Sequence, residues 1–126
     1  MSFDGLEAQF QDAVADLLRM SGWKVNHQRP GRTADGWNTA TSYDGVGFPD
    51  LLCLHPNLGW VWAIECKAEG GRLSEAQEQW ADWFEDAERN SGETIRYFVL
   101  KPSSWDRFVA FLENHMRRPF AHAPET

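Results

Sequence analysis

The chain has 126 residues with a formal net charge of −7, two cysteines and seven tryptophans. Its length fits one domain, and two cysteines are too few for a disulfide scaffold. No apolar run approaches the roughly 20 residues that span a bilayer, and the N-terminus shows no secretory signal, so we expect an intracellular, cytoplasmic protein without membrane contact. The acidic balance by itself disfavours nucleic acid as a partner.

The first half of the chain alternates between helical and strand patterns. Apolar residues recur at spacings of three and four over residues 4–21, which predicts a first helix. A short strand is expected at about 23–28. The segment 29–47 is rich in Gly, Thr, Asn, Asp and Ser, so we expect a long irregular segment that is functional or disordered. Two apolar runs, 50–55 and 60–64, flank a good turn sequence and predict a β-hairpin.

The second half continues the alternation. A helix is expected at 75–90, then a strand at 94–100, then a last helix whose apolar stripe runs over 105–116. The segment 119–126 contains two prolines and is expected to be a flexible tail. A single domain therefore spans residues 1–118.

These elements predict an α/β fold in the order α-β-β-β-α-β-α. An antiparallel hairpin followed by a helix that crosses over to another strand gives a mixed four-stranded sheet flanked by helices. Both hairpin strands are apolar on both faces, so we expect both sides of the sheet to be covered. The cysteines, Cys53 and Cys66, lack the spacing of a zinc finger or ribbon and are expected to be buried free thiols.

A register argument brings three charged residues to one end of the hairpin. If the four residues after His55 form the turn, His55 pairs with Trp60 and Asp50 falls opposite Glu65. Lys67, two residues further, lies on the same face. Facing carboxylates in a half-buried sheet are destabilising, and a divalent cation such as Mg²⁺ would compensate them. A solvated hairpin end with an ordinary Lys–Glu pair would explain the same pattern.

Three short motifs carry a family resemblance. Two of them together resemble the PD-(D/E)xK nuclease signature: Gly47-Phe48-Pro49-Asp50 and, after fourteen residues, Glu65-Cys66-Lys67. The predicted order of elements resembles the core of that superfamily, a restriction-endonuclease-like fold. The third motif is Leu73-Ser74-Glu75-Ala76-Gln77. It is similar to the segment that follows the catalytic lysine in the virus-type replication-repair nuclease (VRR-Nuc) group. Archaeal-type Holliday junction resolvases are a related branch, and the resemblance covers about residues 4–100.

The resemblance implies roles for the motif residues. In this superfamily the two motif acids hold the metal, which implies that Asp50 and Glu65 are catalytic metal ligands. The backbone carbonyl after the second acid is commonly a further ligand, here that of Cys66. The motif lysine, here Lys67, orients or activates the hydrolytic water and offsets charge on the phosphate. The implied cofactor is Mg²⁺ or Mn²⁺, and the implied chemistry is metal-assisted phosphodiester hydrolysis.

Two further polar residues each have two interpretations. Glu7 lies with the apolar stripe of the first helix and matches the glutamate that many members add to the metal site. It also follows Asp4, a plausible N-cap, by three residues and would complete a capping box, but we favour the metal-site role. Gln77 fits an S-x-x-Q capping box with Ser74, and the resembled group places a catalytic glutamine here. Both roles are compatible for Gln77.

The charge is unevenly distributed along the chain. Residues 17–34 contain four bases and no acid, whereas residues 73–93 contain seven acids and one base. We expect a DNA backbone to approach over basic residues beside Lys67, namely Lys24, Arg29, Arg32 and Arg72. An ordinary mixed surface is the alternative.

The resemblance implies a Mg²⁺-dependent deoxyribonuclease, a DNA endonuclease. The chain has no room for a separate sequence-reading domain, so we expect recognition of DNA shape, such as a Holliday junction, flap or branch. Symmetric cutting of a four-way junction needs two active sites, which favours a homodimer. The alternatives are a repair- or restriction-type nuclease on ordinary duplex or single-stranded DNA, and a non-catalytic DNA-binding module with the same fold. A virus-encoded protein acting in a host cell is also compatible.

Overall fold

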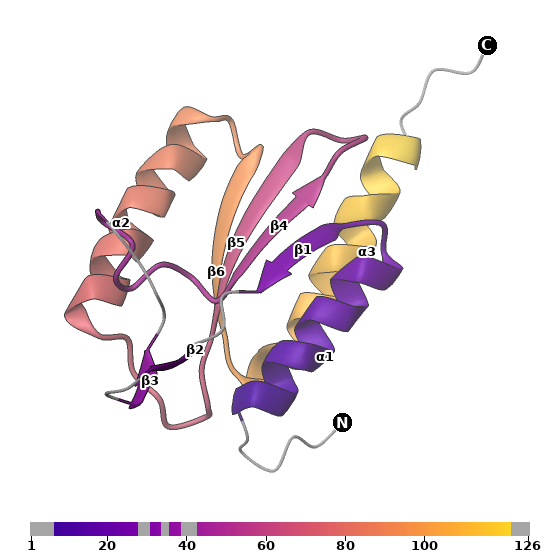
Figure 1. Cartoon of the computed structure of the whole chain (residues 1–126). Coiled ribbons are helices and arrows are strands. Elements are labelled where there is room, and N and C mark those ends of the chain that lie inside the picture. The colour runs from indigo at the N-terminus through magenta and orange to yellow at the C-terminus, as the bar shows by residue number, and fades with distance from the viewer. Residues whose placement is uncertain (1–6, 28–30, 34–35, 39–42, 122–126) are drawn as a thin grey trace.

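The structure is a computed structural model that describes residues 7–27, 31–33, 36–38 and 43–121. Figure 1 shows a central sheet with helices on either side. The elements in chain order are α1 (Glu7–Met20), β1 (Lys24–His27), β2 (Gly31–Thr33), β3 (Gly36–Asn38), β4 (Leu51–His55), β5 (Trp60–Cys66), α2 (Glu75–Asn90), β6 (Ile95–Leu100), a short 3₁₀ turn η1 (Pro102–Ser104) and α3 (Trp105–Ala121).

The main sheet has four strands in the order β1-β4-β5-β6. β4 pairs antiparallel with both β1 and β5, whereas β5 and β6 are parallel, so the sheet is mixed as predicted. The hairpin register is also as predicted, with His55 opposite Trp60 and Leu51 opposite Ile64. The α/β fold with a restriction-endonuclease-like core is therefore confirmed.

Helices cover both faces of this sheet. α1 and α3 lie together on one side and α2 lies on the other, next to β6 (Figure 1). The face toward α1 and α3 is the hydrophobic core, because Trp62 of β5 packs there against Trp23, Phe98 and Phe108, with ring centroids 4.3, 5.0 and 6.2 Å away. Cys53 and Cys66 are buried in the same cluster as free thiols, as predicted.

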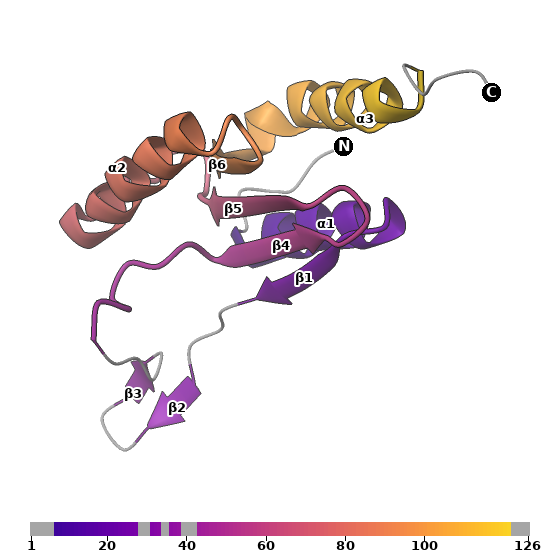
Figure 2. The same ribbon diagram turned by 90° about the horizontal axis from the view of Figure 1, so that it is seen from above.

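The prediction of one irregular segment over 29–47 is wrong. β2 and β3 pair antiparallel and form a separate two-stranded sheet. Figure 2 shows this pair lying apart from the main sheet. Each strand has three residues, which is too short for the alternation of four to eight residues by which a strand is recognised in sequence.

The last helix is longer than predicted. α3 continues to Ala121, so the expected tail 119–126 begins inside a helix, and residues 122–126 lie outside the described residues. Within the described part of the chain, no helix is long and apolar enough to cross a membrane.

Candidate active site

The end of the β4–β5 hairpin brings together Asp50, Glu65 and Lys67. The ladder ends at the pair Leu51 and Ile64, so the same register places Asp50 opposite Glu65, the second-last residue of β5. The backbone N–H of Cys66 donates a hydrogen bond of 2.9 Å to Asp50 Oδ2. Lys67 Nζ lies 3.9 Å from Glu65 Oε1. The convergence predicted from the turn and the two-residue period of the strands is therefore present.

Glu65 is an unusual residue for a protein interior. Its side chain is 1% exposed, and within the described structure its Oε2 has no hydrogen-bond partner. Burial, followed by the charge of Asp50, raises its pKa to about 8, and the charge of Lys67 opposes both effects. A buried carboxylate oxygen without a partner costs folding free energy unless a cation or a proton compensates it. The oxygen fits a metal ligand.

Gln77 contacts this carboxylate from α2. Its Nε2 donates a hydrogen bond of 2.9 Å to Glu65 Oε1. Its Oε1 accepts a 2.8 Å hydrogen bond from the backbone N–H of Ser74, and Ser74 Oγ accepts one from the Gln77 N–H at 3.2 Å. Gln77 therefore completes the capping box of α2, as predicted, and also holds the Glu65 carboxylate. Its catalytic role stays a prediction.

Glu7 lies in the first turn of α1 and is partly buried. Desolvation raises the pKa of its carboxyl, Lys67 lowers it and Asp50 raises it, so Glu7 is within electrostatic range of the site. Asp4, the partner in the alternative capping box, lies outside the described residues. The role of Glu7 as a metal ligand stays a prediction.

The donor set at this end of the sheet suits a hard divalent cation. Among the residues that the structure describes, no group of three His, Cys, Asp or Glu residues is placed to hold a metal ion. The available protein donors are thus the two carboxylates of Asp50 and Glu65 and backbone oxygens such as the Cys66 carbonyl. Mg²⁺ is commonly held by one or two carboxylates, with water and phosphate oxygens completing its shell. The residues present fit such an ion.

The basic residues predicted to contact DNA have different positions. Arg72 is exposed between β5 and α2, close in sequence to Lys67. Lys24 is exposed on β1 and pairs with Leu54, whereas His27 pairs with Leu51 near the site. Since strands rise about 3.3 Å per residue, Lys24 lies roughly 10 Å further from the site than His27 does. Arg29 lies outside the described residues, and the side chain of Arg32 in β2 is not among those described.

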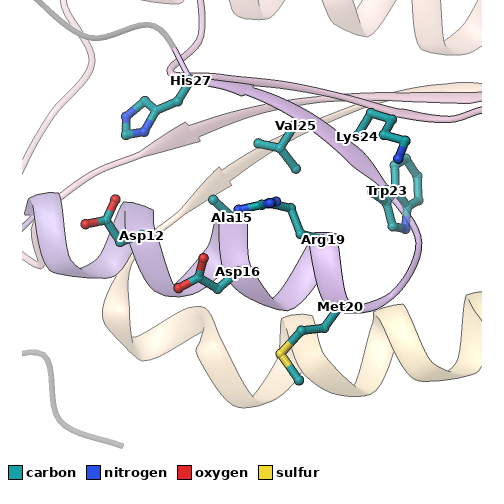
Figure 3. Close-up of a pocket in the computed structure, with 9 residues that line it drawn as sticks. All are labelled: Asp12, Ala15, Asp16, Arg19, Met20, Trp23, Lys24, Val25 and His27. Carbon is teal, nitrogen blue, oxygen red and sulfur yellow. The ribbon is translucent and has the colours of Figure 1, made fainter.

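Lys24 also has neighbours of both charge signs. It lines a surface hollow of about 870 Å³ between α1 and β1, with Asp12, Asp16 and Arg19 of α1. Figure 3 shows Lys24 and His27 at opposite ends of β1 on the rim of this hollow. Lys24 therefore lies at the end of β1 that is farther from the carboxylates, whereas Arg72 is near Lys67 in sequence. A role of Arg72 in DNA binding stays a prediction.

One residue near the site was not singled out in sequence. The Nε1 of Trp80 in α2 donates hydrogen bonds to the carbonyls of Asp44 and Val46, in the segment that precedes Asp50. Gly47 has a conformational role. Its φ is +84°, and an added Cβ would lie 2.5 Å from the carbonyl carbon of Ala76. Periodicity predicts which face of α2 is apolar, but it does not predict these long-range partners.

A mixed α/β sheet with two acids and a lysine at the hairpin end is the arrangement of a PD-(D/E)xK nuclease. A family model described as the VRR-NUC domain matches residues 12–101. This is more than half of the chain, so the chain belongs to the VRR-NUC domain family and is a nuclease of the VRR-Nuc type. The match includes Asp50, Glu65, Lys67 and Gln77, but it begins after Glu7. A search of curated proteins finds no match.

Proposed function

We propose that this protein is a metal-dependent DNA endonuclease with its active site at Asp50, Glu65 and Lys67. The observation that carries the proposal is the buried Glu65 carboxylate, whose Oε2 has no partner within the described structure although Asp50 lies opposite. An acid in this position is costly in a purely structural role. It is expected where a cation binds, and Mg²⁺ or Mn²⁺ is the ion that these oxygen donors suit.

We propose a role for each residue of the site. Asp50 and Glu65 hold the ion, with the Cys66 carbonyl and Glu7 as proposed additional ligands. A bound Mg²⁺ supplies Lewis-acid polarisation of the scissile phosphate. Lys67, 3.9 Å from Glu65, offsets the charge that develops on the phosphate and orients the attacking water. Gln77 fixes the Glu65 carboxylate through its 2.9 Å hydrogen bond.

The distribution of charge supports a substrate of particular shape. The outer face of α2 carries five exposed acids, namely Glu75, Glu78, Asp82, Glu85 and Asp86. Phosphates are repelled from such a face, so a straight duplex has limited basic surface to follow. We propose a branched substrate, such as a Holliday junction or a flap, with Arg72 contacting the backbone beside the site. A homodimer would supply the two active sites that symmetric junction cutting requires.

A cleavage panel tests the proposal. Wild-type protein, Asp50→Asn and Glu65→Gln would be incubated with a four-way junction, a flap, a duplex and a single strand, with Mg²⁺ or Mn²⁺ and with chelator. We expect the wild type to cut branched DNA only with metal, and both variants to be inactive while folded. Equal cutting of duplex or single strand would instead favour a repair- or restriction-type nuclease. Junction binding without cleavage and without Mn²⁺ binding would identify a non-catalytic DNA-binding module.

A further inference from the structure

The segment 44–49, which leads into Asp50, lies against the first two turns of α2. The indole N–H of Trp80 donates to two of its carbonyls, that of Asp44 at 2.9 Å and that of Val46 at 3.1 Å. These partners stand 36 and 34 residues earlier in the chain. One side chain of α2 thus holds two carbonyls of a segment that contains no strand residues.

Packing reinforces these hydrogen bonds. The ring of Phe48 meets Trp80 edge-on, with centroids 4.9 Å apart, and Pro49 is fully buried. Gly47 lies so close to α2 that an added Cβ would be 2.5 Å from the carbonyl carbon of Ala76. Every residue from 46 to 49 therefore has a described contact or close approach that limits its movement, and Asp50 follows directly.

Trp80 and Gln77 stand three residues apart and project from the same face of α2. Gln77 holds the Glu65 carboxylate directly. Trp80 holds the backbone that places Asp50, whose Oδ2 accepts the Cys66 N–H. One helix face is thus in contact with both halves of the acid pair, one by a side chain and the other through a loop.

We propose that Trp80 is a positioning residue of the active site, which keeps Asp50 in register with Glu65 by holding segment 44–49 on α2. The inference rests on the proposed function for its effect on cleavage, but not for its effect on the position of Asp50. A misplacement of about 1 Å at a catalytic group can lower a rate about 100-fold.

The direct test uses the Cys66 amide, because its N–H donates to Asp50 Oδ2 and so reports where that carboxylate lies. Trp80→Phe keeps a ring against Phe48 but removes the N–H donor. We expect hydrogen exchange of the Cys66 amide, measured by NMR, to be about tenfold faster in this variant. A tenfold change is the size expected from the loss of one or two hydrogen bonds. Its chemical shift should move as well. An unchanged Cys66 amide would overturn the inference.

Trp83→Phe is the matched control. Trp83 lies on the same helix and contacts the Trp80 ring edge-on at 4.9 Å, and it is 45% exposed. We expect Trp83→Phe to leave the Cys66 amide unchanged. If both variants shift it equally, the effect belongs to aromatic packing and the positioning role is wrong. Should Trp80→Phe fail to fold, the indole N–H at residue 80 can be replaced by sulfur through an unnatural amino acid of the same shape, with the same expected result.

Kinetics give the second readout. Trp80→Phe should lower kcat for DNA cleavage about 10- to 100-fold with KM within about twofold, because substrate contacts are retained while the acid pair is misaligned. Trp83→Phe should match wild type. A rise in KM at constant kcat would assign Trp80 to substrate binding and contradict positioning. If wild-type protein cleaves no DNA, the proposed function fails, and the Cys66 amide still decides the inference about Trp80.

Discussion

Replacing Glu65 with glutamine tests whether the buried Glu65 carboxyl group lowers the unfolding free energy of the metal-free protein. The glutamine keeps the size of the side chain and an oxygen that accepts from Gln77 Nε2, but it removes the ionisable group. Burial, followed by the charge of Asp50, raises the pKa of Glu65 from the ordinary 4.5 to about 8. Between these values the folded protein keeps a proton that the unfolded chain releases, so stability should fall as the pH rises from 4.5 to 8.

The size of this effect follows from proton linkage. One pKa unit corresponds to about 1.4 kcal/mol, so wild-type protein should lose about 3 kcal/mol of unfolding free energy, relative to Glu65→Gln, between about pH 5 and pH 8. Above about pH 8 the difference should level off, because Glu65 is then ionised in both states. Comparison with the variant removes the contribution of titrating groups that do not interact with Glu65.

Urea unfolding of metal-free protein at several pH values measures the effect. Wild type, Glu65→Gln and Asp82→Asn would be compared in chelator, with Asp82 as an exposed acid of α2 that lacks the burial of Glu65. We expect the difference between wild type and Glu65→Gln to grow with pH. The Asp82→Asn variant controls for removing a negative charge from the surface of the protein. Parallel curves for wild type and Glu65→Gln would refute the assignment of a raised pKa to Glu65.

Four further substitutions test other parts of the site and its surroundings. Lys67→Ala should lower kcat about 100-fold while Mn²⁺ binding, measured by calorimetry, is retained; loss of binding as well would make Lys67 part of the metal site. Gly47→Ala should lower the unfolding free energy by about 1–3 kcal/mol in urea titrations, because a Cβ would contact the carbonyl of Ala76 and φ is +84°. Arg72→Ala should weaken DNA binding and reduce its salt slope by about one, and Lys24→Ala should do so less; the reverse order would move the DNA path to β1.

The sequence was sufficient for the core of the site because two local rules decide it. A tight four-residue turn after His55 fixes the pairing, and the strand period of two then puts Asp50 opposite Glu65 whatever the rest of the chain does. The capping box of α2 is equally local, since it depends on Ser74 and Gln77 alone. These features could be predicted without any knowledge of tertiary structure.

Features that depend on distant segments could not be predicted in this way. The hydrogen bond of Gln77 to Glu65 requires α2 to lie on a particular face of the sheet, and the apolar stripe of α2 does not specify which one. The carbonyls that Trp80 meets belong to a loop more than 30 residues away. The β2–β3 pair was missed for another reason, because three-residue strands have no period to read.

The hydrophobic core explains how a fold of this size tolerates the buried acid Glu65. Between the sheet and the helices α1 and α3, the side chains of Trp62, Phe10 and Leu18 are fully buried. Each such side chain stabilises the fold by about 1.5–3 kcal/mol. One or two of these residues offset the cost of about 3 kcal/mol that the raised pKa of Glu65 implies at neutral pH. Removing the charge at Glu65 should therefore not unfold the protein. A loss of cleavage in Glu65→Gln, together with unchanged or higher stability, would then be a loss of chemistry and not of structure.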